Sequence, residues 1–484
     1  MRPRLSSELD SLIVKSVALA FALIMPVVLG LSPKIFGDGD VSWHIAAGNW
    51  ILANGRVPEV DPFSYTMLGH PWVAFEWLSQ IIYASAFNAA GYRGLAVVVI
   101  IALLALHAIT FRFLAGRVKP LALVCALVAM DVILASFLFA RPHVLVWPVL
   151  ALWTALLLDC RDKGRTPPLG LALLMVLWVN LHGSFVLGFV IAAAIALDAL
   201  NAAKWDRAMF LGWLTFGLVA LAAAFVNANG VTGVFHPFNV MGLENLAFIQ
   251  EWEPSIPSVT PAFFAILLFI LGLTLRSGVR LALGEILLLM FMLLLAFSQV
   301  RHQSWLAIVA PLILAPRLAP GDEAGAEPYF AQKSMQPLGL IIAVAALAML
   351  GVRMALPVQP DDNAGSPRIL LANVPASLRS KPVFNEYSFG GPLILAGIRP
   401  YIDGRSEMYG DAFVADYMAI QGGDTDRFKR AVRKYGIAWT LLPPNNRLTR
   451  MLDASPDWRR IYADKVAVVH VRTHLAAPAA GQPN

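Results

Sequence analysis

Hydrophobic residues along this chain form long runs joined by short polar connections. A helix of about 20 apolar residues spans the hydrocarbon core of a bilayer. Eleven stretches are near this length, and several of them are short enough to need tilt or extension. They cover residues 12–32, 94–115, 119–140, 143–160, 168–185, 186–203, 208–226, 261–276, 281–299, 303–317 and 336–356. The pattern predicts an α-helical polytopic membrane protein with about eleven transmembrane helices.

The pattern changes after residue 356, where charges are dispersed and short apolar runs are punctuated by Gly, Pro and Asn. This composition predicts a small soluble α/β domain over 357–484 that follows a membrane domain over 1–356. Strands are predicted at 382–387, 399–402, 438–442 and 466–471, and helices near 411–434 and 446–453. Within the membrane domain, residues 33–93 form one long loop that we expect to carry short interfacial helices.

Composition supports lipid as the main solvent, because 58% of the residues are hydrophobic and only 14% are charged. The net charge of +6 does not indicate nucleic-acid binding, since Lys and Arg lie in short clusters between apolar runs rather than on one basic face. The two cysteines, Cys125 and Cys160, lie in or beside predicted spans and offer no disulfide framework.

Positive charge marks every second connection, as the positive-inside rule requires if the N-terminus is cytoplasmic. The basic residues of these connections are Arg112, Arg117, Lys119, Arg161, Lys163, Arg165, Lys204, Arg207, Arg276, Arg280, Arg317 and Lys333. The opposite connections are richer in Trp, His, Asn, Asp and Glu. We therefore expect a multi-pass membrane protein with loop 33–93 and the C-terminal domain outside the cytoplasm.

The loop over 33–93 opens with two carboxylates, Asp38 and Asp40, and an imidazole, His44. Asp40 is placed to cap a helix over 41–53, which leaves the charge of Asp38 uncommitted just outside the first turn. Three interpretations of these side chains remain open. The three side chains can hold a divalent cation, Mg²⁺ or Mn²⁺; one carboxylate can act as a general base; or the segment is only a turn and a cap.

Two further acids lie in the same loop. Asp61 precedes Pro62 and is best explained by turn chemistry. Glu76 lies between Phe75 and Trp77 at the expected membrane boundary, where an apolar setting favours a raised pKa and a catalytic role.

Polar clusters recur at the predicted external ends of later helices, and charges at that depth normally face a cavity or a partner. We therefore predict a polar chamber for substrate, with two guanidinium groups that are suited to grip phosphate. Its predicted members are His44, Arg141, His143, His182, Glu251, Arg301 and His302. Taken singly, each Arg is also explained by snorkelling or by pairing with Glu251 or Glu253, and each His by a helix-end hydrogen bond.

In the C-terminal domain, Asn385, Asp403 and Arg405 fall at predicted strand ends, where α/β sheets often hold ligands. Asp403 and Arg405 are therefore candidates for substrate binding. A turn with a local ion pair at Asp403-Gly404-Arg405 explains the same residues equally well. Nucleotide-binding and hydrolase motifs do not occur in the context that each requires.

An odd first helix, a long external loop opening with Asp38 and Asp40, many short-looped helices and an external α/β domain together resemble the GT-C superfamily. Its members include protein O-mannosyltransferases, aminoarabinose transferases and oligosaccharyltransferases. The segments that look like those of bacterial membrane proteins near this superfamily are Asp61-Pro62-Phe63-Ser64, Glu76-Trp77-Leu78, Asn180-Leu181-His182-Gly183-Ser184 and Asp403-Gly404-Arg405. Aminoarabinose transferases carry Lys-Pro-Pro where this loop has His70-Pro71-Trp72.

The resemblance implies a membrane glycosyltransferase that takes sugar from a polyprenyl-phosphate-linked donor in the bilayer and gives it to an extracytoplasmic glycan, lipid or protein. It implies that Asp38 or Asp40 is the catalytic or metal-binding acid. Two other functions use the same features: a transporter or flippase for a lipid-linked or anionic solute, and a non-catalytic subunit of an envelope polysaccharide assembly.

Overall fold

The computed structural model describes residues 2–243, 250–321, 336–355, 358–363 and 365–473. The chain divides into two compact units. The helical unit comprises Met1–Ser32, Ala90–Pro237 and Ala247–Val358. The mixed unit comprises Pro33–Ala89, Phe238–Leu246 and Gln359–Asn484. The first long loop is therefore part of the same compact unit as the C-terminal residues.

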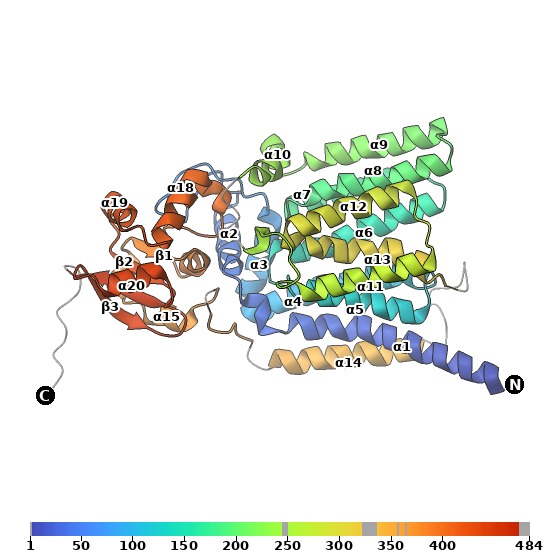
Figure 1. Cartoon of the computed structure of the whole chain (residues 1–484), viewed down its shortest axis with the longest axis horizontal. Helices are drawn as coiled ribbons and strands as arrows, with labels where there is room; N and C mark the ends of the chain where they lie inside the picture. The colour runs from blue at the N-terminus through green and yellow to red at the C-terminus, as the bar shows by residue number, and fades with distance from the viewer. Residues whose placement is uncertain (1, 244–249, 322–335, 356–357, 364, 474–484) are drawn as a thin grey trace. The chain divides into compact units, whose positions relative to one another are not determined.

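Helices of the helical unit lie side by side along one common direction (Figure 1). They are α1 (Arg2–Gly30), α4 (Tyr92–Leu114), α5 (Pro120–Leu134), α6 (Pro142–Asp162), α7 (Leu173–Leu181), α8 (Phe185–Ala202), α9 (Arg207–Ala224), α11 (Pro261–Ser277), α12 (Leu283–Ser298), α13 (Gln303–Leu318) and α14 (Gln336–Ala355). Each predicted apolar stretch overlaps one of these helices. In the part of the chain that is described, five are long and apolar enough to cross a membrane: α1, α4, α6, α8 and α9.

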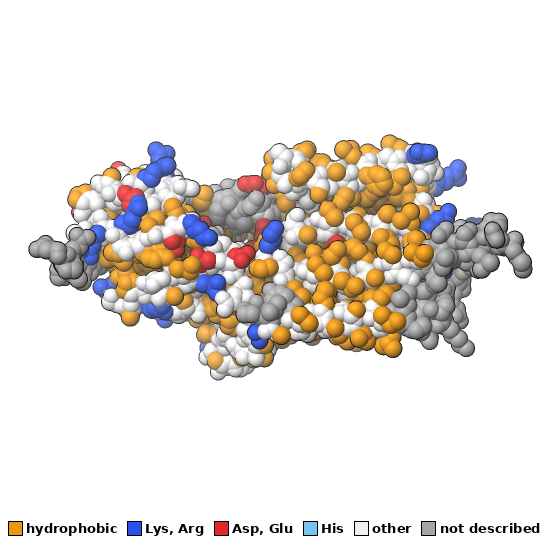
Figure 2. Space-filling model, turned by 90° about the horizontal axis from the view of Figure 1, so that it is seen from below, with side chains coloured by type: hydrophobic (Ala, Val, Ile, Leu, Met, Phe, Trp, Pro, Cys, Tyr) orange, Lys and Arg blue, Asp and Glu red, His pale blue; other side chains and the backbone are white. Residues whose placement is uncertain are grey.

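The surface of this unit is apolar, as Figure 2 shows over the visible helices. Large hydrophobic side chains are exposed on several of them, for example Leu121 at 65%, Leu173 at 71% and Leu275 at 75%. A soluble protein rarely exposes contiguous apolar surface on this scale. Lipid contact accounts for the surface, and the unit is that of a membrane protein.

Inside the helical unit, aromatic side chains fill the space between α6, α7 and α9. Trp153 of α6 lies with its ring 6.5 Å from Trp178 of α7 and 5.5 Å from Phe216 of α9. Its Nε1 donates a 2.9 Å hydrogen bond to the carbonyl of Gly188 in α8. A Cβ at Gly188 would lie 2.9 Å from the terminal methyl of Met175 and 3.0 Å from the ring of Trp178, so glycine leaves room for these α7 side chains against α8. Such small-residue contacts hold helices together where lipid is as apolar as the core.

One end of the helical unit is built from ion pairs between predicted cytoplasmic connections. Arg117 donates to Asp159 at 2.9 Å, and Arg161 and Arg317 donate to Glu285 at 2.8 and 2.9 Å. Arg117, just after α4, thus binds the last turns of α6, and the last turns of α6 and α13 bind the first turn of α12. Connections that the charge pattern placed on one side of the membrane therefore meet at one end of the unit.

The mixed unit contains a four-stranded sheet in the order β1-β2-β4-β3. The strands are β1 (Val383–Asn385), β2 (Trp439–Leu442), β3 (Trp458–Ala463) and β4 (Val468–Arg472). β1 and β2 are parallel, and the other two pairings are antiparallel. The sheet carries α15 (Arg368–Asn373), α16 (Ala376–Arg379), α17 (Gly390–Leu395), α18 (Ser406–Gln421), α19 (Thr425–Tyr435) and α20 (Arg447–Asp453). The first long loop adds α2 (Asp40–Asn54), which packs on α17, and α3 (Trp77–Ala90).

The predicted strands at 382–387, 438–442 and 466–471 correspond to β1, β2 and β4, whereas the strand predicted at 399–402 was wrong. The side chain of Asn385 binds that segment instead, accepting from the backbone N–H of Tyr401 and donating to the carbonyl of Ile402, both at 2.8 Å. A side-chain amide thus satisfies backbone groups that a strand would pair with a neighbour.

Candidate functional site

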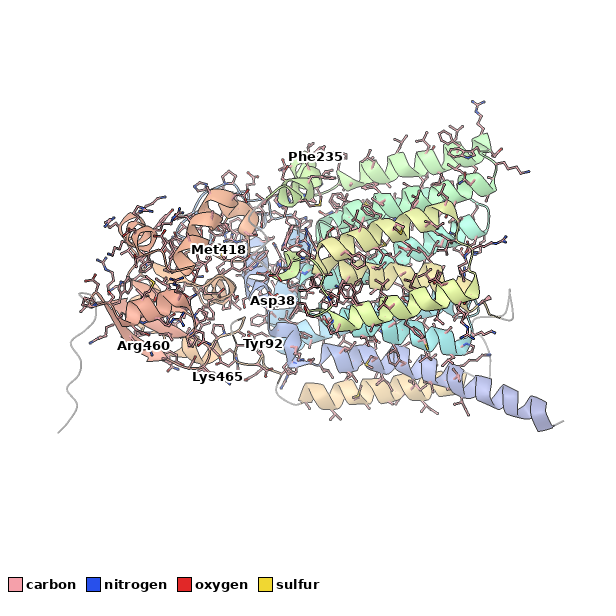
Figure 3. The ribbon with its side chains drawn as sticks, in the orientation of Figure 1. Asp38, Tyr92, Phe235, Met418, Arg460 and Lys465 are labelled. Atoms are coloured by element: carbon pink, nitrogen blue, oxygen red, sulfur yellow. The ribbon has the colours of Figure 1, made fainter. Side chains whose placement is uncertain are left out.

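The acid turn, residues 37–40, leads into α2 (Figure 3 labels Asp38). Asp38 Oδ1 accepts a 2.8 Å hydrogen bond from the backbone N–H of Asp40. Asp40 Oδ1 accepts a 2.9 Å hydrogen bond from Trp43 Nε1, one turn into the helix. The prediction that Asp40 caps α2 was wrong: the helix begins at Asp40, with Gly39 as N-cap and no side-chain cap bond there. Asp38 instead binds the backbone N–H of the first helical residue.

The next polar group of α2 is His44, which is 1% exposed and lies beside the carboxylate of Glu76 at the start of α3. His44 Nε2 and Glu76 Oε2 are 3.8 Å apart, and Glu76 is 8% exposed. The ring of Trp43 lies 3.7 Å from that of His44. Two residues singled out separately in the sequence are therefore neighbours within one buried polar pair.

Arg405 is the centre of a second buried group in the mixed unit. Its Nε and Nη2 donate to the two oxygens of Asp403 at 2.8 and 2.7 Å, and its Nη1 donates to Asp61 at 2.7 Å. Tyr409 donates to the same Asp403 carboxylate at 2.7 Å. Arg405, Asp403 and Asp61 are at most 1% exposed. This group resembles a bidentate clamp with an added carboxylate, an arrangement that orders the backbone around it.

The surroundings of Arg405 are aromatic on one side. Its guanidinium lies 5.2 Å from the ring of Phe63 and 4.7 Å from that of Trp72, both in the first long loop. Burial alone would lower the pKa of Arg405, but the charges and hydrogen bonds of Asp403 and Asp61 outweigh burial and raise it. Arg405 therefore stays charged and holds the two segments of the unit together.

Glu407 lies two residues further along, at the start of α18. Burial raises the pKa of its carboxyl from 4.5 to about 7, although the charge of Arg405 and a hydrogen bond from Trp72 work against the rise. Tyr387 also has a raised pKa, first because it is buried and then because the charge of Asp40 faces it. The charges of Asp40, Arg405 and Glu407 are thus close enough to affect one another or a shared neighbour.

No three His, Cys, Asp or Glu side chains among the described residues are arranged to hold a metal ion. Asp38 and Asp40 each direct an oxygen to a hydrogen-bond donor within the turn. Mg²⁺ or Mn²⁺ binding by Asp38, Asp40 and His44 stays a prediction, and no step below depends on it.

The remaining predicted residues lie in the helical unit, at the end opposite the Glu285 ion pairs. Arg141, which precedes α6, donates to Glu251 in a close ion pair. The guanidinium of Arg301 lies 3.4 Å from the ring centroid of Trp252, and its Nε donates to Gln299 at 3.0 Å. Each Arg is therefore held by a neighbouring side chain.

Three histidines accompany these arginines. The rings of His143 and His182 are 6.5 Å apart, and His182 interacts electrostatically with Arg141, Arg301 and His302. His143 Nε2 donates to the carbonyl of Phe137 at 2.8 Å, and His182 Nδ1 accepts from the backbone N–H of Ser184 at 3.0 Å. Helix ends separated by up to 160 residues thus form one polar cluster, here called the Arg/His cluster.

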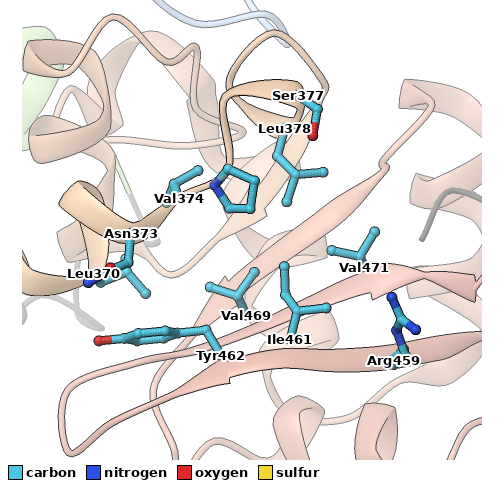
Figure 4. Close-up of a pocket in the computed structure, with 11 residues that line it drawn as sticks. Leu370, Asn373, Val374, Ser377, Leu378, Arg459, Ile461, Tyr462, Val469 and Val471 are labelled. Carbon is cyan, nitrogen blue, oxygen red and sulfur yellow. The ribbon is translucent and has the colours of Figure 1, made fainter. Parts of the chain in front are cut away.

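The mixed unit also contains a pocket of about 300 Å³ between α15, α16 and the β3-β4 pair (Figure 4). Leu370, Leu378, Val469 and Val471 line it and belong to the core of the unit. None of the predicted site residues lines this pocket.

Sequence reasoning missed Trp43, Tyr387, Trp252 and Gln299 as partners of the predicted residues. Trp43 had a usable signal, because it stands three positions after Asp40 and so lies on the same helix face. Tyr387 had no such signal in the sequence, because its proximity to Asp40 depends on how distant segments of the mixed unit fold.

Apolar helices with an exposed hydrophobic surface, together with a mixed α/β unit that includes the first loop, define the class as a polytopic membrane protein. No family model matches the chain, and no curated protein matches it. The chain is similar to the crystal structure of ArnT from Cupriavidus metallidurans in the apo state, with 14% sequence identity, a TM-score of 0.50 and coverage of 98% of this chain and 100% of that chain. A structure of the same protein bound to undecaprenyl phosphate gives 13% identity, a TM-score of 0.48 and coverage of 98% and 99%. The likeness to the apo structure shows a similar fold over nearly the whole chain.

Proposed function

We propose that the protein is a glycosyltransferase of the bacterial inner membrane that uses a polyprenyl-phosphate-linked sugar as donor. The observation that carries this proposal is the Arg/His cluster, in which Arg141, Arg301, His143 and His182 gather at one end of an apolar helical unit. Two guanidinium groups at this end of the unit suit a phosphate whose lipid tail stays in the bilayer. The similarity to ArnT, one structure of which is bound to undecaprenyl phosphate, agrees with this donor class.

In the proposed reaction, an acceptor hydroxyl attacks the anomeric carbon of the donor sugar, and the bond from that carbon to the phosphate oxygen breaks. The lipid phosphate leaves with the bonding electron pair. Arg141 and Arg301 stabilise the negative charge that develops on it. Glu251 is the resting partner of Arg141 in this scheme, and the phosphate replaces it when the donor binds.

Asp40 is the proposed general base that takes the proton of the acceptor hydroxyl. One oxygen of Asp38 accepts a hydrogen bond from the backbone of the turn, and we assign Asp38 to stabilise the conformation of the turn. Asp40 Oδ1 accepts from the indole N–H of Trp43, and this hydrogen bond orients the carboxylate. We assign Glu76 to orient His44, and Asp403 and Arg405 to hold the mixed unit together rather than to contact the acceptor.

Cleavage of the donor gives the most general test, because every donor of this class releases a free lipid phosphate whatever its sugar. The purified protein in lipid vesicles is given polyprenyl-phosphate-linked hexose and aminopentose donors, and release of the lipid phosphate is measured. We expect release from at least one donor in the presence of acceptor. No release from any donor, with the lipids moved intact across the vesicle membrane, would establish the transporter instead.

The role of the arginines is tested by binding of undecaprenyl phosphate alone. Arg141→Gln and Arg301→Gln are each expected to weaken binding about 10- to 100-fold, because a charge-assisted contact to phosphate is lost. Arg276→Gln is the matched control, since Arg276 is an exposed residue in the last turn of α11. Equal binding by all three variants would exclude the Arg/His cluster as the phosphate site.

A further inference from the structure

Backbone from distant parts of the mixed unit encloses the acid turn. A Cβ on Gly404 would overlap Asp40 Oδ1 and lie 2.7 Å from Trp43 Nε1. A Cβ on Gly365 would lie 2.8 Å from the carbonyl carbon of Asp38, and one on Gly391 would overlap the carbonyl of Gly39. Three glycines of the C-terminal part thus touch three successive residues of the turn at distances where a Cβ would force a neighbouring atom to move.

The contact is reciprocal at Gly39. A Cβ there would overlap the carbonyl oxygen of Ser388, so the turn needs a glycine where it passes Ser388, and α17 needs one at Gly391 where it passes Gly39. Glycine costs conformational entropy, and its use at such crossings serves close approach of two backbones. None of these four glycines has a positive φ, so the need is for space and not for a left-handed conformation.

The oxygen of Asp40 that faces Gly404 is the same one that accepts from Trp43 Nε1. Residue 404 is itself fixed, because its carbonyl accepts a 3.1 Å hydrogen bond from the hydroxyl of Tyr387. Arg405, the next residue, is anchored to Asp61 and Asp403. The carboxylate of Asp40 is therefore set between an indole donor and a backbone segment that two further groups hold in place.

We propose that the C-terminal part of the mixed unit is a positioning device for the acid turn, in which Gly404 and Tyr387 set the place of the Asp40 carboxylate. The consequence for catalysis rests on the proposed function, since it assumes that Asp40 is the general base. A base must lie within hydrogen-bond reach of the proton that it removes, so a shift of the carboxylate by an ångström lowers turnover without affecting donor affinity.

Gly404→Ala is the direct test, with Gly422→Ala as control. Gly422 has αR dihedral angles and its Cβ would lie 3.3 Å or more from any neighbour, so alanine is accommodated there. We expect Gly404→Ala to lower kcat about 10- to 100-fold with the KM for the donor unchanged. Tyr387→Phe removes only the hydroxyl and should act in the same direction with a smaller fall, which preserves the test if Gly404→Ala does not fold.

A second readout does not depend on activity. With fluorotryptophan at position 43, the ¹⁹F resonance should shift in Gly404→Ala and in Asp40→Asn, and should be unchanged in Gly422→Ala. An unshifted resonance in folded Gly404→Ala and Tyr387→Phe, or an unchanged kcat in both while Asp40→Asn is inactive, would overturn the positioning role. Full activity of Asp40→Asn with shifted resonances would refute the proposed base and leave the positioning device standing.

Discussion

Arg405 donates a 2.7 Å hydrogen bond to Asp61 across 344 positions of sequence, and neither side chain is exposed to solvent. The pair joins the first long loop to the segment that follows the predicted strand at 399–402. Since Asp403 binds the same guanidinium, two carboxylates share one cation in the interior of the mixed unit. The first loop is thus held to the C-terminal residues by charge as well as by the glycine contacts of the acid turn.

Replacing Arg405 by alanine should be strongly destabilising. The change leaves Asp61 and Asp403 buried without their cation, which costs about 3–5 kcal/mol of unfolding free energy. Arg427→Ala is the control, because Arg427 pairs with Asp416 at the surface and such pairs contribute about 0–1 kcal/mol. Thermal and denaturant unfolding of the purified variants measures both. Equal stability of the two variants would refute the clamp.

Stability should fall as pH rises through neutrality because of Glu407. Its pKa is raised from 4.5 to about 7 in the folded protein, so the folded state binds this proton more tightly than the unfolded chain does. The stabilisation is complete below the unfolded pKa and is lost as pH rises through the folded pKa, a change of about 1–3 kcal/mol.

Glu407→Gln should remove the contribution of Glu407 to the fall in unfolding free energy with pH, measured from pH 4.5 to pH 8. Asp426→Asn, a change at an exposed position of α19, should keep the slope of the parent protein. A slope that survives in Glu407→Gln would assign the titration to another group.

His107 of α4 and Asp131 of α5 form a buried pair in the helical unit, with His107 Nε2 at 3.1 Å from Asp131 Oδ2. His107→Ala leaves a carboxylate among apolar helices and should cost about 3 kcal/mol. The double variant His107→Ala/Asp131→Ala should recover most of that loss, because no polar group is then stranded. Unfolding in detergent checks the cycle, and additive losses would show that the two side chains do not interact.

Membrane topology can be tested in the full chain with labelled positions in the helical unit. In a background with Cys125→Ser and Cys160→Ser, single cysteines replace exposed Lys163 and exposed Glu253. The charge pattern predicts that an impermeant thiol reagent added outside the inner membrane labels position 253 and not position 163. Labelling of position 163 alone would invert the proposed orientation.

The helices were predictable because a bilayer imposes its thickness on the sequence. The stretch predicted at 143–160 is α6 (Pro142–Asp162), and Pro142 occupies the first turn, where its missing N–H costs nothing. The mixed unit was harder. β3 was missed because Arg459 and Arg460 interrupt its apolar pattern at the edge of the sheet.

The site was predictable only where partners are close in sequence or share a helix end. Pairing of Arg141 with Glu251 was one of the explanations that the sequence left open, and the structure shows this ion pair. The partnership of Arg405 with Asp61, and the enclosure of Asp40 by Gly404, depend on contacts between segments hundreds of residues apart. No local pattern encodes such a contact. The sequence assigned Asp61 to a turn, and its oxygens do accept from the backbone N–H groups of Phe63 and Ser64 at 2.9 and 3.1 Å. The additional hydrogen bond from Arg405 had no signal in the sequence.

The central claim is that a carboxylate of the acid turn does chemistry. The most direct measurement is kcat for release of lipid phosphate from a polyprenyl-phosphate-linked sugar, with undecaprenyl phosphate binding measured on the same samples. Asp40→Asn should lower kcat by about 100-fold or more, as expected for loss of a general base, with lipid binding and folding intact. Asp38→Asn should have a smaller effect because it keeps an acceptor oxygen for the turn. Unchanged kcat in both variants would contradict the account.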